Sequence, residues 1–322
     1  MQYLRPNTIH YGRSEHKMLE IEPNSVALSL WSPPYFVGKK YEKEETFESW
    51  QLMLRKVIHN HALVLKAGGF IVINIADILC FKDVEMPKIQ ALNISNQKCK
   101  VTKEMVLEAC QKYPDYSRYK LAKLLGCSEQ TIDRRLNGNN IRGGKHQIQT
   151  RVKLVGHYLE QYAQDVGIYL YDRRVWVKDP AWVNSQWTSN TLKAVSEYED
   201  LYIFWKPGEY VIDRSKLSTQ EWKEWGARGV WYINSVRAND NHEAKFPEEL
   251  ATRIIRLFSA EGDLVIDPFM GSGTTAVAAI KMNRKYIGIE KESCYVKLAE
   301  DRLKNLTPVQ LELNLDYFKT IS

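Results

Sequence analysis

Apolar positions along most of this chain alternate between short buried runs and helical spacing. The apolar runs at 26–31, 70–75 and 264–267 are bounded by proline, glycine or acidic residues, as is typical of buried strands. Between the first two runs, apolar residues at helical spacing predict a helix over about 47–65, followed by a turn at 66–69. This alternation predicts an α/β fold on a mostly parallel sheet.

The alternation stops between residues 81 and 146, where helical patterns occur without a strong strand. It resumes afterwards, and a further set of elements is expected: a helix over 147–165, strands over 168–177 and 200–205, an irregular region over 209–241, a helix over 247–259, a strand over 264–267, a helix to about 282 and a strand over 286–289. We therefore expect an α/β core with an inserted helical module.

Charge is unevenly distributed between the core and this insert. The whole chain carries +6, whereas the segment 98–151 has twelve Lys and Arg against five Asp and Glu, a net charge of +7. Such a local basic block favours a polyanionic partner, although a solvated charged face would have the same composition.

Composition also excludes several classes of protein. No apolar run reaches the roughly 20 residues that cross a bilayer, and the first residues lack the apolar core of a signal peptide. The five cysteines contain no Cys-x-x-Cys pair, and their odd number fits neither a disulfide scaffold nor a zinc site. We expect a cytoplasmic protein without a membrane segment and without a metal.

A glycine-rich loop follows the predicted strand 264–267, with the sequence Asp267-Pro268-Phe269-Met270-Gly271-Ser272-Gly273-Thr274. A strand, glycines and a helix in this order suit a nucleotide-like ligand, because glycine lets the backbone approach it closely. Glu290 ends the next strand, where a carboxylate can accept hydrogen bonds from ribose hydroxyls. Only 47 residues follow Thr275, too few for half of a doubly wound sheet, so the missing strands must precede the loop.

A second motif, Ser32-Pro33-Pro34-Tyr35, ends the first predicted strand. The prolines remove amide donors and leave carbonyl oxygens as acceptors, and the Ser32 hydroxyl adds another. Tyr35 can stack on a flat ring. Two acceptors aimed at an exocyclic amine would free its lone pair for reaction, so the motif predicts a pocket for an amine-bearing ring.

The insert contains a helix-turn-helix pattern between Tyr119 and Leu136. Ala122 suits a helix crossing, Gly126 a turn, and Ile132 a core position, and residues 102–113 would form the preceding helix. The side chains expected to face a major groove are Gln130, Thr131, Arg134 and Arg135. The alternative is a helical insert for packing or dimerisation.

These motifs, in this order, resemble the SPPY-type, β-class DNA amino-methyltransferases, most of which produce N4-methylcytosine. The resemblance implies S-adenosylmethionine as methyl donor and direct transfer to the amine nitrogen. Absence of a Pro-Cys pair agrees, since methylation of a ring carbon needs a cysteine nucleophile. The residues that the resemblance assigns to the cofactor are Ser14, His242, Phe246, Asp267, Pro268, Phe269, Gly271, Ser272, Gly273, Thr274 and Glu290.

The same resemblance includes the segments Phe36–Glu42, with Lys39 as a DNA contact, Asn74–Asp77, and Glu199 before a strand. The chain departs from the family at Gly12-Arg13-Ser14, where Gly-Asp is usual near the cofactor adenine, and we expect Ser14 to compensate. A milder departure is His242-Glu243-Ala244-Lys245, where the family usually has His-Pro-Ala-Pro.

We therefore expect a permuted, Rossmann-like S-adenosylmethionine-dependent methyltransferase sheet with helices on both faces. The expected segments are a catalytic half at 1–80, the helical DNA-binding insert at 81–146, the rest of the catalytic half at 147–208, a target-recognition region at 209–241 and the cofactor half at 242–322. The expected function is cytosine-N4 methylation of flipped bases in duplex DNA, within a restriction-modification system. Adenine-N6 methylation and a DNA-binding regulator with an inactive core are the alternatives. The recognition sequence, a homodimer and a cognate restriction endonuclease stay open.

Overall fold

A computed structural model describes residues 3–36, 46–81, 85, 100–137, 151–179, 194–236 and 246–306. Lys39 and His242 lie outside these residues. The chain divides into two compact units, one comprising 1–81, 151–184 and 195–322 and the other comprising 82–150 and 185–194. In the described part of the chain, no helix is long and apolar enough to cross a membrane.

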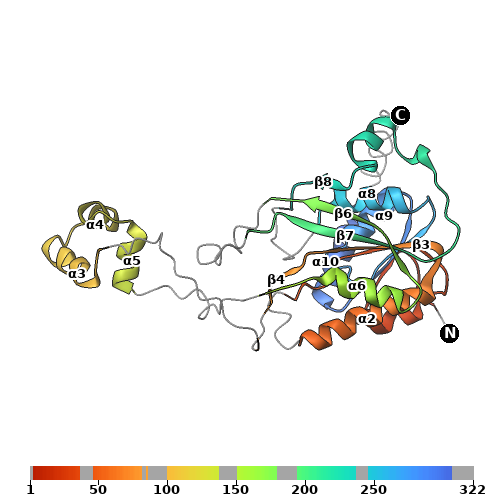
Figure 1. Ribbon diagram of the computed structural model, residues 1–322, viewed down its shortest axis with the longest axis horizontal. Coiled ribbons are helices and arrows are strands. Elements are labelled where there is room, and N and C mark those ends of the chain that lie inside the picture. The colour runs from red at the N-terminus through yellow and green to blue at the C-terminus, as the bar shows by residue number, and fades with distance from the viewer. Residues whose placement is uncertain are drawn as a thin grey trace. The chain divides into compact units, whose positions relative to one another are not determined.

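The first unit is built on a twisted sheet in which the described residues form eight strands (Figure 1). The spatial order is β1-β10-β9-β2-β3-β7-β6-β8. The strands are β1 Thr8–Tyr11, β2 Val26–Trp31, β3 Leu65–Ile75, β6 Tyr169–Val177, β7 Tyr198–Trp205, β8 Val230–Tyr232, β9 Leu264–Asp267 and β10 Lys285–Glu290.

Strand direction decides which residues meet at each edge of the sheet. From β1 to β3 all neighbours are parallel, whereas β7 is antiparallel to both β3 and β6. The carboxyl ends of β9, β10, β2 and β3 therefore share one edge with the amino end of β7, where Ile75 pairs with Asp200. We call this the catalytic edge, and in open α/β sheets it is where ligands bind.

Helices cover both faces of the sheet (Figure 1). One face carries α2 and α6, and the other carries α8, α9 and α10. The helices of this unit are α1 Ser14–Lys17, α2 Phe47–Val64, α6 Val155–Gln164, α8 Glu248–Phe258, α9 Thr274–Lys281 and α10 Ser293–Lys304, with short turns η1 Met18–Glu20, η4 Arg214–Lys216, α7 Thr219–Glu221 and the π-helical η5 Trp222–Gly226.

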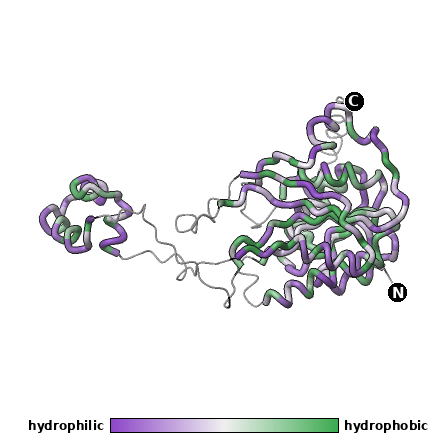
Figure 2. Tube along the Cα trace, viewed as in Figure 1, coloured by the Kyte–Doolittle hydropathy of each residue, from purple (hydrophilic) through white to green (hydrophobic). Residues whose placement is uncertain are grey.

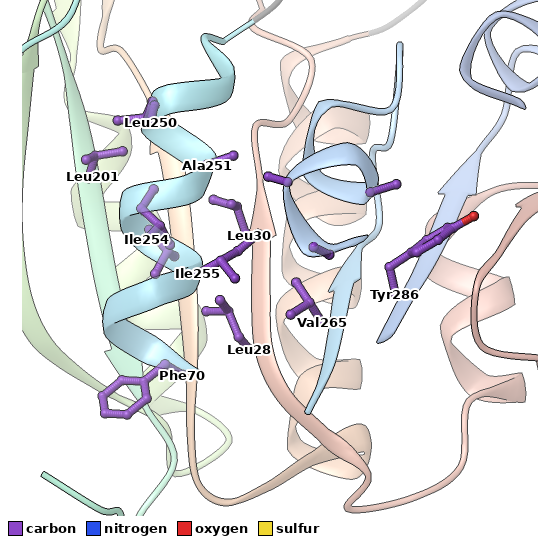
Figure 3. Close-up of a cluster of buried hydrophobic side chains, with 14 of the residues drawn as sticks. Leu28, Leu30, Phe70, Leu201, Leu250, Ala251, Ile254, Ile255, Val265 and Tyr286 are labelled. Atoms are coloured by element: carbon purple, nitrogen blue, oxygen red, sulfur yellow. The ribbon is translucent and has the colours of Figure 1, made fainter. Parts of the chain in front are cut away.

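Alternation along the central strands creates a separate core on each face. In β3, Phe70 and Val72 belong to one hydrophobic cluster, whereas Ile71 and Ile73 belong to the other. Central strands are accordingly apolar along their length (Figure 2). Figure 3 shows α8 against this sheet, with Ile255 beside Leu28 and Leu30 of β2 and Leu250 beside Leu201 of β7.

In the described residues of the second unit, three helices form a small bundle: α3 Lys103–Lys112, α4 Arg118–Leu125 and α5 Glu129–Asn137. Thr102 and Ser117 cap the first two helices, and Gly126 ends α4 at φ 67°, a left-handed conformation that favours glycine. Ala122 and Ile132 are buried in its small core, as the sequence predicts. The predicted helix-turn-helix residues therefore lie on α4, the turn at Gly126 and α5.

The two ends of the segment that carries this bundle come together at the first unit. Strand β4 Ile78–Phe81 pairs antiparallel with β5 Arg151–Lys153, in a register of Ile78 with Lys153 and Phe81 with Arg151. Lys153 lies over the rings of Phe47 and Phe81, at 5.2 and 4.8 Å from their centroids.

Three predictions about local structure are wrong. Residues 66–69 are not a turn but part of β3, because Gly68 and Gly69 exchange backbone hydrogen bonds with Lys206 at the end of β7. The helix predicted from 147 begins only at Val155, since residues 151–153 pair with β4. The region 209–241 contains α7, η5 and β8 rather than irregular chain alone.

Candidate active site at the carboxyl edge of the sheet

Asp267 orders the glycine loop from inside. Its carboxylate oxygens accept hydrogen bonds from the Phe269 amide at 2.9 Å and from the Thr275 hydroxyl at 2.6 Å. Burial raises the pKa of Asp267 to about 7, and the nearby Glu290 carboxylate adds to the shift. Asp267 thus fixes both the start of the loop and the first turn of α9.

The loop reaches α9 through two glycines with left-handed backbone. Gly271 has φ 51° and Gly273 has φ 83°, and Gly273 is the N-cap of α9. A Cβ at Gly273 would lie 3.0 Å from the Cβ of Ala299 on α10, so the loop packs closely against that helix. Arg302 of α10 completes the packing by donating to the Ser272 carbonyl at 3.3 Å and the Thr274 hydroxyl at 3.1 Å.

Glu290 lies beside this loop at the end of β10. One carboxylate oxygen accepts from the Gly271 amide at 2.8 Å and the other from the Glu292 amide at 2.9 Å. Burial is the main cause that raises the pKa of Glu290. Because a carboxylate oxygen can accept more than one hydrogen bond, both oxygens retain capacity for ligand hydroxyls.

The N-terminal segment closes over the same loop. Ser14 is buried and donates to the Pro268 carbonyl, while the amide of Gly12 donates to the carbonyl of Glu290 at 2.9 Å. Arg13 is directed elsewhere, since its guanidinium pairs with Glu15 at 2.6 Å and is mostly exposed. The serine, rather than the arginine, is therefore the member of this unusual segment that contacts the loop.

The Ser32-Pro33-Pro34-Tyr35 motif lies at the end of β2, next to the glycine loop. Trp31, directly before this motif, and Phe269 of the glycine loop have ring centroids 5.3 Å apart. The indole of Trp50 on α2 donates to the Pro34 carbonyl at 2.7 Å. The Pro34 carbonyl is thus occupied, and the Pro33 carbonyl is the other proline acceptor of the motif.

Tyr35 joins the motif to the neighbouring strands. Its hydroxyl lies 2.7 Å from Glu199 Oε2 and 3.4 Å from the Asn74 carbonyl, and it receives a hydrogen bond from Ser32 Oγ at 3.2 Å. Asn74 comes from β3 and Glu199 from β7, so strand order brings three distant segments together.

Two ion pairs complete this half of the catalytic edge. Lys178, directly after β6, pairs with the buried carboxylate of Glu199, and Arg173 of β6 pairs with Asp200 at 2.7 Å. Sequence reasoning missed Lys178 because its partner is 21 residues away on a neighbouring antiparallel strand. Asp77 has a structural role, since its carboxylate accepts a hydrogen bond at 2.8 Å from the amide of Val155, the first residue of α6.

The described parts of the region 209–241 lie at both edges of the sheet. Its first part is at the opposite edge of the sheet, where Tyr210 packs on Phe70 at 5.4 Å and Lys216 donates to the carbonyl of Ser259 before β9. Only its last part reaches the catalytic edge, since Tyr232 of β8 pairs with Val177 at the end of β6. The Tyr232 side chain is 77% exposed there.

In the three-helix unit, the four groove-facing candidates differ in their surroundings. Gln130 and Arg134 are exposed on α5, and Thr131 is bonded to Ser128 at the start of that helix. Arg135 Nε instead donates to the Val101 carbonyl at 3.0 Å. Part of the Arg135 side chain therefore stabilises the bundle.

Comparison with known proteins identifies the family. Residues 26–301 match the N6/N4 methyltransferase family, described as DNA methylase. The chain belongs to this DNA methylase family. A type II methyltransferase from Bacillus subtilis, M.BglI, is 57% identical over 302 residues, which cover 94% of this chain and 87% of that protein.

Solved structures of low sequence identity share the fold of this DNA methylase. A putative DNA modification methylase from Thermus thermophilus, in complex with S-adenosyl-L-methionine, has a TM-score of 0.59 at 22% identity and covers 94% of each chain. The cytosine-N4-specific PvuII DNA methyltransferase has a TM-score of 0.58 at 16% identity, covering 99% of this chain and 95% of that one. The family depends on S-adenosylmethionine, and the mixed α/β fold predicted from the sequence is confirmed.

Proposed function

We propose that this DNA methylase transfers a methyl group to the N4 amine of cytosine in duplex DNA, as the modification enzyme of a type II restriction-modification system. The observation that carries the proposal is the hydroxyl of Ser32, which lies at the catalytic edge beside the glycine loop and donates to Tyr35. Support for cytosine comes from serine, rather than aspartate or asparagine, at the head of the motif.

The cofactor half of the site suits S-adenosylmethionine, which supplies an electrophilic methyl group when bound. Glu290 has acceptor capacity for the two ribose hydroxyls, and the loop 268–274 presents backbone close to the ligand. Asp267 and Ser14 keep that loop in place. Phe246, partly buried against the core next to α8, and His242 are proposed for the methionine end.

The ring half of the site suits a flipped base. We assign the two amine hydrogens of cytosine to Ser32 Oγ and to the Pro33 carbonyl, because Trp50 already occupies the Pro34 carbonyl. Tyr35 would stack on the ring. A base inside a duplex must leave the stack to reach such a pocket.

Other parts of the chain are proposed to hold the duplex. In the three-helix unit, Gln130, Thr131 and Arg134 remain candidates for groove contacts, with a smaller part for Arg135. In the first unit, Lys39 stays a candidate because of the family resemblance, and β8, which reaches the catalytic edge, is a second candidate. A cognate endonuclease would share the recognition sequence in the cytoplasm without having to bind this chain.

The test is to identify the modified base. Duplex plasmid DNA incubated with the protein and S-adenosylmethionine is digested to nucleosides and analysed by mass spectrometry against standards. N4-methylcytosine is the expected product. N6-methyladenine would assign the enzyme to adenine, and DNA binding without cofactor binding or methyl transfer would favour the regulator.

A further inference from the structure

A continuous chain of hydrogen bonds leads from the proposed amine position to a buried ion pair. Ser32 Oγ donates to the Tyr35 hydroxyl at 3.2 Å, and that hydroxyl donates to Glu199 Oε2 at 2.7 Å. The other carboxylate oxygen of Glu199 accepts from Lys178 Nζ. Glu199 itself is buried, with 6% of its surface exposed.

The direction of these bonds follows from the single proton of a phenol. The Tyr35 hydroxyl lies closer to the Glu199 carboxylate, at 2.7 Å, than to the Asn74 carbonyl at 3.4 Å, and the carboxylate is the stronger acceptor. The Tyr35 proton therefore points to Glu199, and Ser32 must donate to Tyr35. The lone pairs of Ser32 Oγ are then left for the substrate amine, and successive donation makes that oxygen a better acceptor.

Methylation of an exocyclic amine creates a surplus proton. The nitrogen that accepts the methyl group becomes positively charged, and it must lose one of its hydrogens before it can conjugate with the ring again. This conjugation makes the charged amine a strong acid, so a carboxylate is basic enough to receive the proton.

We propose that this proton leaves through Ser32 and Tyr35 to Glu199 as the methyl group arrives, an inference that rests on the proposed function. The amine N–H bond breaks while a new O–H bond forms on Ser32. The former Ser32 proton moves to the Tyr35 oxygen, and the former Tyr35 proton moves to Glu199 Oε2. Charge balances because the amine becomes neutral and Glu199 becomes an uncharged carboxylic acid.

The surroundings of Glu199 suit such an acceptor. Its carboxylate is paired with Lys178, whose side chain is 20% exposed, so the acceptor lies near the protein surface. The adjacent carboxylate, Asp200, accepts hydrogen bonds from Arg173 and Tyr202. The carboxylate that Tyr35 contacts at 2.7 Å is that of Glu199, which is therefore the acceptor in the proposal.

The test compares Glu199→Gln, Tyr35→Phe and the double variant in single-turnover methylation of duplex DNA. Each single variant should be slower by about 10²-fold, with unchanged affinity for S-adenosylmethionine and DNA, because one acid–base group typically contributes that much. The double variant should be no slower than the slower single variant, because both interrupt one path. Glu221→Gln, which removes a carboxylate paired with Arg256 on the α8 side, is the control for folding.

Rates in mixtures of H2O and D2O separate proton transfer from positioning. The wild-type protein should show a curved dependence on deuterium content, and Tyr35→Phe should lose the curvature. A rate within about threefold of wild type in both single variants, or an unchanged curve in Tyr35→Phe, would overturn the relay. If Glu199→Gln does not fold, Tyr35→Phe decides. A wild-type protein that transfers no methyl group at all would overturn the proposed function, and the relay with it.

Discussion

The two halves of the catalytic edge are built in different ways. On the cofactor half, the carboxylates of Asp267 and Glu290 bind groups of their own motif, at separations of 2, 8 and 19 residues. On the ring half, Tyr35 bonds to Glu199, which is 164 residues away. The cofactor half is thus largely the property of one strand–loop–helix unit, whereas the ring half exists only once β2, β3, β6 and β7 are in order.

The largest expected effect tests the ring half. Tyr35→Ala removes base stacking, worth about 1–3 kcal/mol, together with the hydrogen bonds to Ser32 and Glu199. Single-turnover methylation should slow by about 10³-fold, and Ser32→Ala should also slow it. Calorimetric titration should show unchanged affinity for S-adenosylmethionine in both variants. A parental rate in Tyr35→Ala would place the base elsewhere.

A second prediction concerns the pH dependence of stability on the cofactor half. Burial raises the pKa of Asp267 from 3.8 to about 7. Between these two pH values, Asp267 is protonated in the folded cofactor-free protein and ionised in the unfolded chain. Stability from this group is therefore full below about pH 4, falls as the pH rises toward 7, and is constant above it. Asp267→Asn, which is always uncharged, removes this dependence.

Urea denaturation between pH 4 and 7.5 measures this prediction directly. The free energy of unfolding of the wild type, relative to Asp267→Asn, should fall by up to about 4 kcal/mol over this range. Parallel curves for the two proteins would mean that Asp267 is ionised in the folded state throughout.

The third prediction concerns cofactor affinity. Asp267→Ala releases the loop, and Glu290→Ala removes the acceptors proposed for ribose, so each should weaken S-adenosylmethionine binding by about ten- to a hundredfold. Calorimetric titration measures it, with the exposed Asp301→Ala of α10 as the control. Wild-type affinity in both folded variants would contradict the cofactor assignment. The two halves of the catalytic edge would then no longer differ in their effect on cofactor binding.

The smallest expected effect concerns a region outside both halves. Arg134→Ala in α5 should weaken DNA binding and, if the guanidinium contacts a phosphate, make the salt dependence shallower by about one unit. Arg135→Ala is a poorer test because it also removes the bond to Val101. Fluorescence anisotropy across a salt series measures the slope. Unchanged affinity, slope and sequence discrimination would support the packing or dimerisation role for the three-helix unit.

The difference between the two halves also explains which parts of the site could be predicted from the sequence. The strand at 26–31 and the loop after Asp267 were predictable because short-range pattern determines them. The pair Lys178–Glu199 was not, because β6 and β7 meet only through sheet pairing. The turn predicted at 66–69 failed for a related reason, since the two glycines form an irregular part of β3, with Gly68 at φ 77°, that is hydrogen-bonded to Lys206.

The antiparallel pair of β4 and β5 has a consequence for how this enzyme can change over evolution. Because Phe81 and Arg151 pair with each other, the two ends of the inserted segment are adjacent in the core. The entropy of closing such a loop rises only slowly with its length, by about 0.6 kcal/mol for each doubling. A module of another size or specificity could therefore replace this segment, while β2, which Ser32 follows, and β7 and β9, which carry Glu199 and Asp267, keep their register.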